Sequence, residues 1–310
     1  MSLIKDYYYR LTSGYYNIGF VTSSIDSILA HDELDVHWLK HNCNNSWFAD
    51  PFIIRIDDSY IFVLVEEWDS HKRKGHISRL IVDGQSYELV HKDVALELDT
   101  HLSFPAYFVK DDIVFIYPEN SASGSLNCYE YDPIGNQCKY KSLIIDSPLT
   151  DAVIIEYEGR TFMFSTRYDE SAGNGNKLFV FELKNGAFAQ EALIEFDESI
   201  ARMAGGFFNW KGKLYRPAQE SNHSYGHAVS IQEARFDNNH WHFKEIKRIE
   251  SPSKRLSFGF HTFNVFGNMI VVDAFQWYHP TIRKMFVDDW GNNNKFVQTA
   301  SQFLRKFCNR

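Results

Sequence analysis

The sequence is poor in cysteine, and the few cysteines it has are scattered. There are four among 310 residues, with no CxxC pair and no histidine at zinc-ligand spacing. This argues against a disulfide scaffold and against a zinc domain, and it favours reduced thiols in the cytoplasm. A bridge between Cys128 and Cys138 stays open as an alternative. Because the histidine spacing gives no metal signal either, we expect neither a metal nor an organic cofactor.

Long apolar segments and basic clusters are also scarce. Residues 1–20 contain no unbroken apolar segment with a small-residue cleavage site, so we expect no secretion signal. No window of the sequence is long and apolar enough to cross a bilayer. The formal net charge is −8, and no basic stripe interleaves with aromatic residues, which argues against nucleic acid as a partner.

Aromatic residues, in contrast, are abundant and favour strands over helices, since they make up 16% of the chain. They occur within a repeated phrase whose first copy opens at Asp50-Pro51, runs through an apolar segment, turns at 57–59 and ends in Glu66-Glu67. The same layout returns at intervals of about fifty residues, which is the spacing of propeller blades. The later copies begin at Ser103, Asp151, Ala204 and His261, and end at Glu119, Thr166, Glu220 and Asp273.

Five copies at this spacing predict an all-β protein, a five-bladed β-propeller that forms a single domain over residues 1–310. Segments 15–20 and 35–39 precede the first copy, and we expect them to complete the last blade and so remove free sheet edges. Only about 294–307 has helical periodicity, and it predicts a short C-terminal helix. We interpret this helix as a cap on the propeller, and the alternative is a basic amphipathic contact with a membrane surface.

The first residues of the inner strands of a propeller converge at one mouth of its axis. Sugar hydroxyls need paired donors and acceptors, and the faces of sugar rings stack on aromatic side chains, so this mouth is a predicted sugar site. The polar residues expected to face one another there are Asp50, Ser103, Asp151, Arg202 and His261. The aromatic residues available as platforms are Trp47, Phe104, Tyr225 and Trp277.

Four carboxylates are the candidate catalytic groups, because a pair of them can perform glycoside chemistry with one as base or nucleophile and one as acid. Asp50 and Asp151 head inner strands, whereas Glu119 and Glu220 close second strands. Each also has a structural alternative, in which the aspartates cap strands or turns and the glutamates are solvated strand ends.

Two arginines of the fourth copy, Arg202 and Arg216, lie in mostly apolar surroundings and therefore need partners. Those partners are either structural carboxylates or a phosphate or carboxylate of a ligand. His261 is either a hydrogen-bonded structural histidine or a base. The predicted substrate-binding set is Trp47, Ser103, Arg202, Arg216, Gln219, Tyr225, His261 and Asn264.

Two phrases resemble family 43 glycoside hydrolases, which are five-bladed propellers. Ala49-Asp50-Pro51-Phe52 is similar to their first blade, and Thr150-Asp151-Ala152 is similar to the segment around their third-blade aspartate. The resemblance implies a general base at Asp50 and an orienting, pKa-tuning role for Asp151. The general acid of that family is a glutamate that opens the fourth blade, and here that position reads Arg202-Met203-Ala204. Simple hydrolysis is accordingly less expected.

A longer series of motifs is similar to the N-terminal propeller domain of glucosamine inositolphosphorylceramide transferases. In the plant proteins sugar transfer is ascribed to a separate C-terminal domain, whereas bacterial stand-alone relatives are associated with cell-surface polysaccharide assembly. The resemblance thus implies a carbohydrate-related propeller and leaves its chemistry open. The motifs are 48–52, 103–105 with 118–119, 201–205 with 216–219, 225–226 and 261–264.

The favoured hypothesis is an enzyme that transfers a glycosyl unit from a nucleotide sugar to a lipid-linked or polysaccharide acceptor. We expect it in the cytoplasm, and peripheral contact with the inner face of the membrane through the C-terminal helix is the alternative. Asp50 would activate the acceptor hydroxyl, Asp151 would orient it or the sugar, and Arg202 with Arg216 would hold the diphosphate, whose departure needs no acid. The alternatives are a glycan-binding or scaffold propeller without turnover and a family 43-like glycoside hydrolase.

Overall fold

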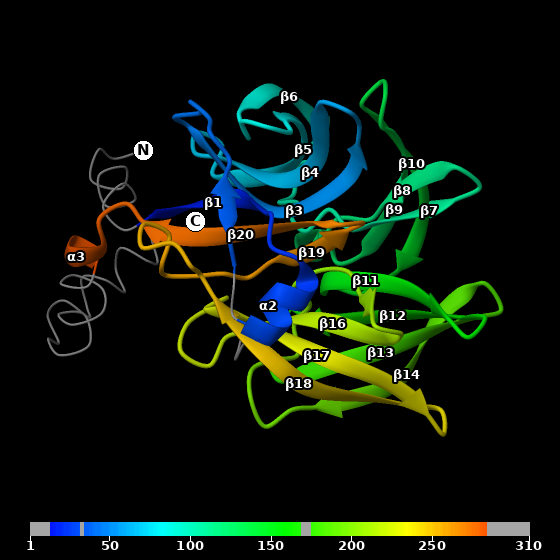
Figure 1. Ribbon diagram of the computed structural model, residues 1–310. Coiled ribbons are helices and arrows are strands. Elements are labelled where there is room, and N and C mark those ends of the chain that lie inside the picture. Colours follow the sequence, from blue (N-terminus) through cyan, green and yellow to red (C-terminus); the bar gives the residue numbers. More distant parts are fainter. Residues whose placement is uncertain (1–12, 32–33, 169–174, 284–310) are drawn as a thin grey trace, which may run out of the picture.

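The computed structural model describes residues 13–31, 34–168 and 175–283. Within them, five four-stranded antiparallel sheets stand around a common axis, which confirms the predicted five-bladed propeller (Figure 1). Each of the first four blades is one continuous stretch of chain with its strands in sequence order. Blade 1 comprises β3 (Ser46–Ile56), β4 (Tyr60–Asp69), β5 (Lys74–Asp83) and β6 (Leu89–Leu96). Blade 2 comprises β7 (Tyr107–Lys110), β8 (Ile113–Ile116), β9 (Leu126–Asp132) and β10 (Gln137–Ile145).

The third and fourth blades follow the same plan, with the predicted hairpin turns between their first two strands. These turns use left-handed backbone at Glu158-Gly159 and Lys211-Gly212, where glycine carries the positive φ without strain. Blade 3 comprises β11 (Leu149–Tyr157), β12 (Arg160–Arg167), β13 (Lys177–Lys184) and β14 (Ala187–Glu195). Blade 4 comprises β15 (Phe208–Trp210), β16 (Lys213–Glu220), β17 (Ala228–Asp237) and β18 (His240–Glu250).

The fifth blade is shared between the two ends of the described chain. It joins β19 (Phe263–Phe266) and β20 (Met269–Trp277) to β1 (Gly14–Val21) and β2 (Val36–Trp38). β1 lies beside β20 along its whole length, as Figure 1 shows with the blue and orange strands. The predicted closure of the ring by the N-terminal strands is thus confirmed, because β1 pairs with β20 and β2 pairs with β1.

The core lies between the blades, where apolar side chains of one sheet pack on the next. Between blades 3 and 4, Phe162 and Phe164 contact the ring of Trp241 with centroid distances of 5.4 and 5.2 Å. Both phenylalanines are almost wholly buried. Each contributes about 2 kcal/mol by removal of its apolar surface from water, so the contacts between blades stabilise the ring.

Helical structure is a minor part of the described chain. α2 (Ile25–His31) connects β1 to β2 and buries Ile28, while η1 (Ser121–Ser123) and α3 (Pro280–Arg283) are single turns. The sequence analysis did not predict α2, because seven residues are too few for a helical period. The predicted helix at 294–307 lies outside the described residues.

The structure also bears on two smaller expectations, the cysteine bridge and membrane-spanning segments. Cys128 and Cys138 are both free thiols, so the alternative of a bridge between them is wrong. Among the described residues, no helix is both long enough and apolar enough to cross a membrane.

Candidate functional site

The candidate site begins with an unusual backbone at the heads of three inner strands. Asp50, Phe104 and Asp151 all have left-handed φ angles, of 49°, 43° and 47°. The strand register shifts at the two aspartates, between Ala49 and Phe52 in blade 1 and between Thr150 and Val153 in blade 3. Such bulges redirect a side chain out of the sheet, and aspartate tolerates left-handed backbone better than most residues. The two aspartates therefore reach across to other blades.

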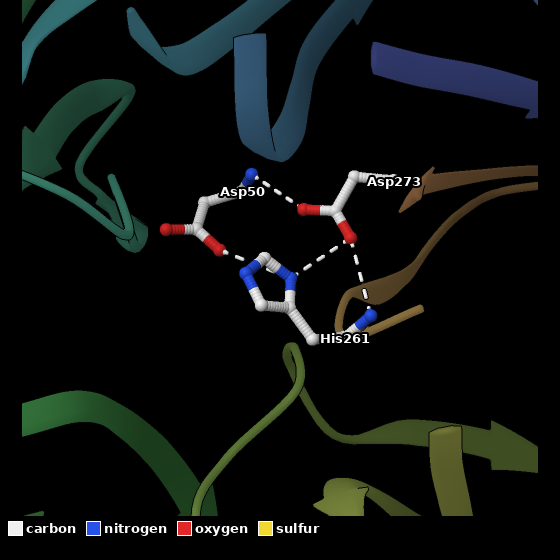
Figure 2. A group of neighbouring side chains, drawn as sticks. All are labelled: Asp50, His261 and Asp273. Atoms are coloured by element: carbon white, nitrogen blue, oxygen red, sulfur yellow. Dashed lines mark hydrogen bonds and ion pairs between the residues drawn. The ribbon is translucent and has the colours of Figure 1, made fainter. Parts of the chain in front are cut away.

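Asp50 of blade 1 is held by groups from blades 2 and 5. Its Oδ2 accepts the N–H of Phe104 at 3.1 Å, and its Oδ1 lies 3.1 Å from the hydroxyl of Thr262. Its own N–H donates to Asp273 Oδ2 at 2.9 Å (Figure 2). Only 5% of the residue is exposed. Burial raises the pKa of Asp50 to about 6, against the opposing charge of His261.

His261 and Asp273 form a buried ion pair beside Asp50, with Nδ1 and Oδ1 2.8 Å apart. Burial opposes the charge on the imidazole, but the adjacent carboxylate outweighs it and raises the pKa of His261 to about 9. In return, the imidazolium lowers the pKa of Asp273 despite its burial. Figure 2 shows His261 between the two aspartates. Its Nδ1 lies 3.9 Å from Oδ1 of Asp50.

These three side chains are also close enough to share a cation, since one ligand atom from each falls within 4.8 Å of the others. Their arrangement is that of a hydrogen-bonded ion pair, because Asp273 accepts the backbone N–H groups of His261 and Thr262. A metal would have to displace the proton that lies between His261 and Asp273. The absence of a metal stays a prediction.

The other half of the mouth links blades 2, 3 and 4. Glu119 Oε2 accepts the N–H of Asp151 at 3.1 Å and lies 3.3 Å from Nη2 of Arg202. Asp151 Oδ2 accepts from Nε of Arg202 and from Nε2 of Gln219, the latter at 2.8 Å. Burial and the neighbouring Asp151 raise the pKa of Glu119, although Arg202 opposes them. A cation and two carboxylates from three blades therefore form one network.

An arc of aromatic rings borders these polar groups. Tyr16 stacks on His261 with a centroid distance of 4.7 Å and contacts Trp47 at 5.2 Å. Trp47 lies parallel to Trp68 at 5.5 Å, and Tyr225 meets His261 edge-on at 5.7 Å. Tyr225 is 53% exposed and lies below the guanidinium of Arg202, so this part of the arc faces solvent.

Most of the predicted site residues come together at this mouth. Ser103 is buried there and pairs through its backbone with Glu119. Asn264 has a structural position, since its amide donates to the carbonyl of Pro51 at 2.9 Å and its Oδ1 accepts the N–H of Gly206 at 2.7 Å. The residues that make the contacts described above are Asp50, Asp151, Glu119, Trp47, Arg202, Gln219, Tyr225 and His261.

Arg216 requires a correction. Its side chain is fully buried inside blade 4, where Nη1 donates to Gln232 Oε1 at 2.6 Å and the guanidinium lies 5.0 Å from the ring of Phe243. Burial lowers the pKa of Arg216 to about 9. Because Arg216 and Gln219 are three residues apart on β16, they face opposite sides of the strand, and only Gln219 reaches the axial network. Arg216 is thus a structural residue and no ligand for a diphosphate.

The same alternation turns Glu220 away from the network. Its Oε1 accepts the N–H of Asn222 at 2.8 Å, in the loop that follows β16. The rings of the other two expected aromatic platforms are placed differently. Phe104 is buried against Phe52, whereas Trp277 packs edge-on against Phe275 and lines one cavity with Tyr16 and Trp47.

Sequence analysis missed four residues of the site: Glu66, Asp273, Thr262 and Tyr16. Glu66 and Asp273 close the second strands of blades 1 and 5, as Glu119 does in blade 2, so the repeat marks their positions but not the direction of their side chains. Nothing in the repeat points to Tyr16, which reaches the site only because β1 closes the ring.

Comparison with known proteins places the chain in a family. The N-terminal domain family of glucosamine inositolphosphorylceramide transferase 1 matches residues 36–259. The chain belongs to this family. Glucosamine inositolphosphorylceramide transferase 1 of Oryza sativa subsp. indica is 24% identical over 195 residues, which are 60% of this chain and 26% of that protein. The Arabidopsis thaliana protein of the same name is 24% identical over 60% of this chain and 25% of its own length. The chain thus spans about a quarter of the length of these relatives.

Solved structures share the fold. An α-L-arabinofuranosidase from Lactobacillus brevis superimposes with a TM-score of 0.52 at 12% identity, over 78% of this chain and 89% of its own. A thermostable family-43 glycoside hydrolase gives a TM-score of 0.51 at 13% identity, over 71% and 84%. At these identities the likeness establishes the architecture alone.

Proposed function

We propose that the chain is a carbohydrate-active propeller that transfers a glycosyl unit to an acceptor hydroxyl at the axial mouth, in the assembly of a surface glycan or glycolipid. The observation that carries this proposal is Asp50, a buried carboxylate with a raised pKa, at the centre of a polar network bordered by aromatic rings. The name of the family's transferases, which describes sugar transfer to a lipid, supports it.

Asp50 is suited to act as a general base. A pKa of about 6 leaves it ionised at neutral pH and makes it a stronger base than an ordinary aspartate. In the proposed step, Asp50 takes the proton of the acceptor hydroxyl as that oxygen attacks the anomeric carbon. The bond from this carbon to the leaving group breaks, and its electron pair departs with the leaving group.

The surrounding groups are suited to bind a sugar. Asp151, Glu119 and Arg202 present acceptors and donors from three blades, and such mixed sets pair with vicinal hydroxyls. Tyr225 and Trp47 offer ring faces at the border of the network. Carboxylates predominate over cations in this network, which favours neutral or amino sugars over anionic ligands.

The identity of the donor decides between two versions of the reaction. The sequence favours a nucleotide sugar, but Arg216 is inside blade 4 and Arg202 is already paired with Asp151 and Glu119. To bind Arg202, a diphosphate would have to break the ion pairs of Arg202 with both carboxylates. A glycoside donor makes no such demand, and this observation supports a second candidate, a family 43-like hydrolase or transglycosylase at the same site.

A ligand screen on three proteins tests the proposal. Thermal shifts and turnover are measured with nucleotide sugars, free nucleotides, neutral oligosaccharides and aryl glycosides, on wild type, Asp50→Asn and Arg202→Ala. We expect a sugar ligand to stabilise wild type and Asp50→Asn alike, while only wild type transfers or releases the sugar. Arg235→Ala, an exposed arginine of the same blade, is the matched control for the loss of charge.

Each outcome has a distinct meaning. Stabilisation by a nucleotide sugar that disappears in Arg202→Ala but persists in Arg235→Ala supports the nucleotide donor. Stabilisation by neutral glycans with release of free sugar supports the hydrolase. Binding without turnover in wild type overturns the enzymatic proposal and leaves a glycan-binding propeller, and no shift with any sugar overturns the carbohydrate site itself.

A further inference from the structure

Glu66 is a buried carboxyl group that the mechanism above does not use. It lies near the end of β4, directly opposite Ala49, the residue that precedes Asp50. The residue is 7% exposed. His101 is a polar neighbour, with its Nε2 3.6 Å from Oε1 of Glu66.

His101 faces Glu66 as a neutral ring with a known tautomer. Its Nδ1 accepts the N–H of Gly75 at 2.8 Å, so in the neutral ring the proton sits on Nε2, the nitrogen nearest Glu66. Burial lowers the pKa of His101, with a smaller contribution from Lys74, and this keeps the imidazole uncharged at neutral pH. Glu66 therefore gains no full positive charge from this neighbour.

Gly75 makes room for the pair. A Cβ atom at this position would lie 2.7 Å from Glu66 Oε1, 2.6 Å from His101 Cε1 and 2.7 Å from the carbonyl oxygen of Leu102. The last of these is backbone and cannot turn aside. The carboxyl of Glu66 and the ring of His101 thus occupy space that only glycine leaves open.

Apart from Arg202 and His261, which are already paired with carboxylates, the charged groups of the mouth are themselves carboxylates. Burial raises the pKa of Glu66 well above its ordinary value, and the nearby charges of Asp50, Glu119, Asp273 and Asp151 raise it further. These carboxylates come from β3, from the segment that follows β8, from β20 and from β11, and His101 comes from the segment before β7. Burial and these like charges therefore favour the protonated form of Glu66.

The next residue, Glu67, provides an internal contrast. It points to the other face of β4, where it accepts from Ser78 Oγ at 2.7 Å, pairs with Lys92 and lies 3.4 Å from His76. Burial opposes its charge, but these partners outweigh burial and lower the pKa of Glu67 to about 2. The pKa values of two adjacent glutamates of one strand are therefore shifted in opposite directions.

We propose that Glu66 is the proton donor of the axial site, and that the substrate it serves is a glycoside with a sugar or alkyl alcohol as leaving group. The proposal rests on the function proposed above and deepens it. Glu66 gives its proton to the glycosidic oxygen as the bond from that oxygen to the anomeric carbon breaks. Asp50 takes the proton of the incoming hydroxyl, whose oxygen forms the new bond, and exchange with solvent restores both groups. The acid missing from the head of blade 4 is thus supplied by blade 1.

The decisive test compares two donors of different leaving-group quality. A methyl glycoside needs an acid to leave, whereas a dinitrophenyl glycoside does not. We expect Glu66→Gln to slow the methyl donor by about 10²–10⁴-fold and the dinitrophenyl donor by less than about tenfold. We also expect the alkaline fall of wild-type activity on the methyl donor to be absent in Glu66→Gln.

Glu67→Gln is the matched control, because it makes the same substitution at the adjacent position without touching the mouth. It is expected to lower stability and to leave turnover per folded molecule and the alkaline fall as in wild type. Equal losses on both donors in Glu66→Gln, or an alkaline fall that persists in it, would overturn the role of Glu66 as donor.

Two measurements do not depend on turnover by a variant. The wild-type pH profile alone must show an alkaline fall for the methyl donor and none for the dinitrophenyl donor. Infrared spectroscopy at neutral pH must show a protonated-carboxyl band that Glu66→Gln removes and Glu67→Gln keeps, and its absence overturns the proposal. If wild type turns over no donor, the proposed function is overturned. If wild type is active and Glu66→Gln is equally active, only the role of Glu66 as proton donor is overturned.

Discussion

The residues around the propeller axis differ sharply between two regions. The first region is the mouth, and the second is a cavity further along the same inner strands. The mouth gathers carboxylates that blades 1, 2, 3 and 5 contribute. The second cavity has a volume of about 230 Å³, and most of the residues that line it, from all five blades, have apolar side chains. The carboxylates at the mouth are Asp50, Glu66, Glu119, Asp151 and Asp273. The apolar side chains of the second cavity include Phe52, Tyr107, Val153, Phe207 and Phe266.

The comparison shows that a residue suited to catalysis and a residue that stabilises the fold lie only two positions apart in one strand. Asp50 and Phe52 flank Pro51 in β3, and both are buried. Asp50 is a desolvated carboxylate near other carboxylates, which lowers the stability of the folded state. Phe52 packs edge-on against Phe104 of the next blade at 5.0 Å, which raises it. We expect substitutions at the mouth to change activity and substitutions in the second cavity to change folding.

The largest expected effect is on activity at the mouth. Asp50→Asn keeps the shape of the side chain but removes the base, so turnover should fall by about 10²–10⁴-fold. Circular dichroism and the unfolding midpoint should show a fold that is intact. Turnover within a few-fold of wild type would show that the base lies elsewhere. The mouth would then no longer differ from the second cavity by a catalytic role of Asp50.

Phe52→Ala tests the other region with a residue of the same strand. Loss of this buried ring should lower the free energy of unfolding by about 3–5 kcal/mol, measured by denaturant titration. Sugar binding by the fraction that remains folded should be unchanged. A variant as stable as wild type, or one that folds fully and no longer binds, would contradict the separation of the two regions.

The pH dependence of stability sharpens the comparison further. Because the pKa of Asp50 is about 6 in the folded state and 3.8 in the reference, the folded protein binds the proton more tightly than the unfolded chain. The free energy of unfolding should therefore fall by about 3 kcal/mol on this account as pH rises through that interval, and the loss persists above it. Denaturant titrations of wild type and Asp50→Asn across that interval measure it, and parallel curves for the two proteins would refute it.

The smallest effect is expected from Gly75→Ala, which crowds Glu66 without removing a charge. The new methyl group must displace His101 or the backbone at Leu102, at a cost of about 1–3 kcal/mol in stability. Gly206→Ala is the control, since its added carbon meets nothing nearer than 3.8 Å. Equal stabilities of the two variants would mean that the space beside Glu66 is not confined.

The repeat in the sequence was sufficient to predict the five blades and the residues that head them. Asp50, Asp151 and His261 were identified because each opens a copy, and the start of an inner strand has a fixed place in a propeller. Ring closure by segments 15–20 and 35–39 was predictable for the same reason, because only an unpaired edge remained to be filled.

The direction of side chains within a strand could not be predicted from the repeat. Neighbouring residues alternate faces, and a bulge such as the one between Ala49 and Phe52 changes which face a later residue takes. This is why Arg216 was assigned to the site, and why Glu66, adjacent to Glu67, was missed. Tyr16 was missed for a different reason, since its neighbours in space are far from it in the sequence.

The closure of the fifth blade has a mechanical consequence. Gly14 pairs with Trp277, and the carbonyl of Ser13 accepts the N–H of Tyr278, so the described chain enters and leaves the ring at one point. Because β1 and β20 are antiparallel and their pairing begins there, tension on the two ends loads their hydrogen bonds one pair at a time. A pull along the chain would thus unzip the ring at low force from this seam, before any other blade bears load.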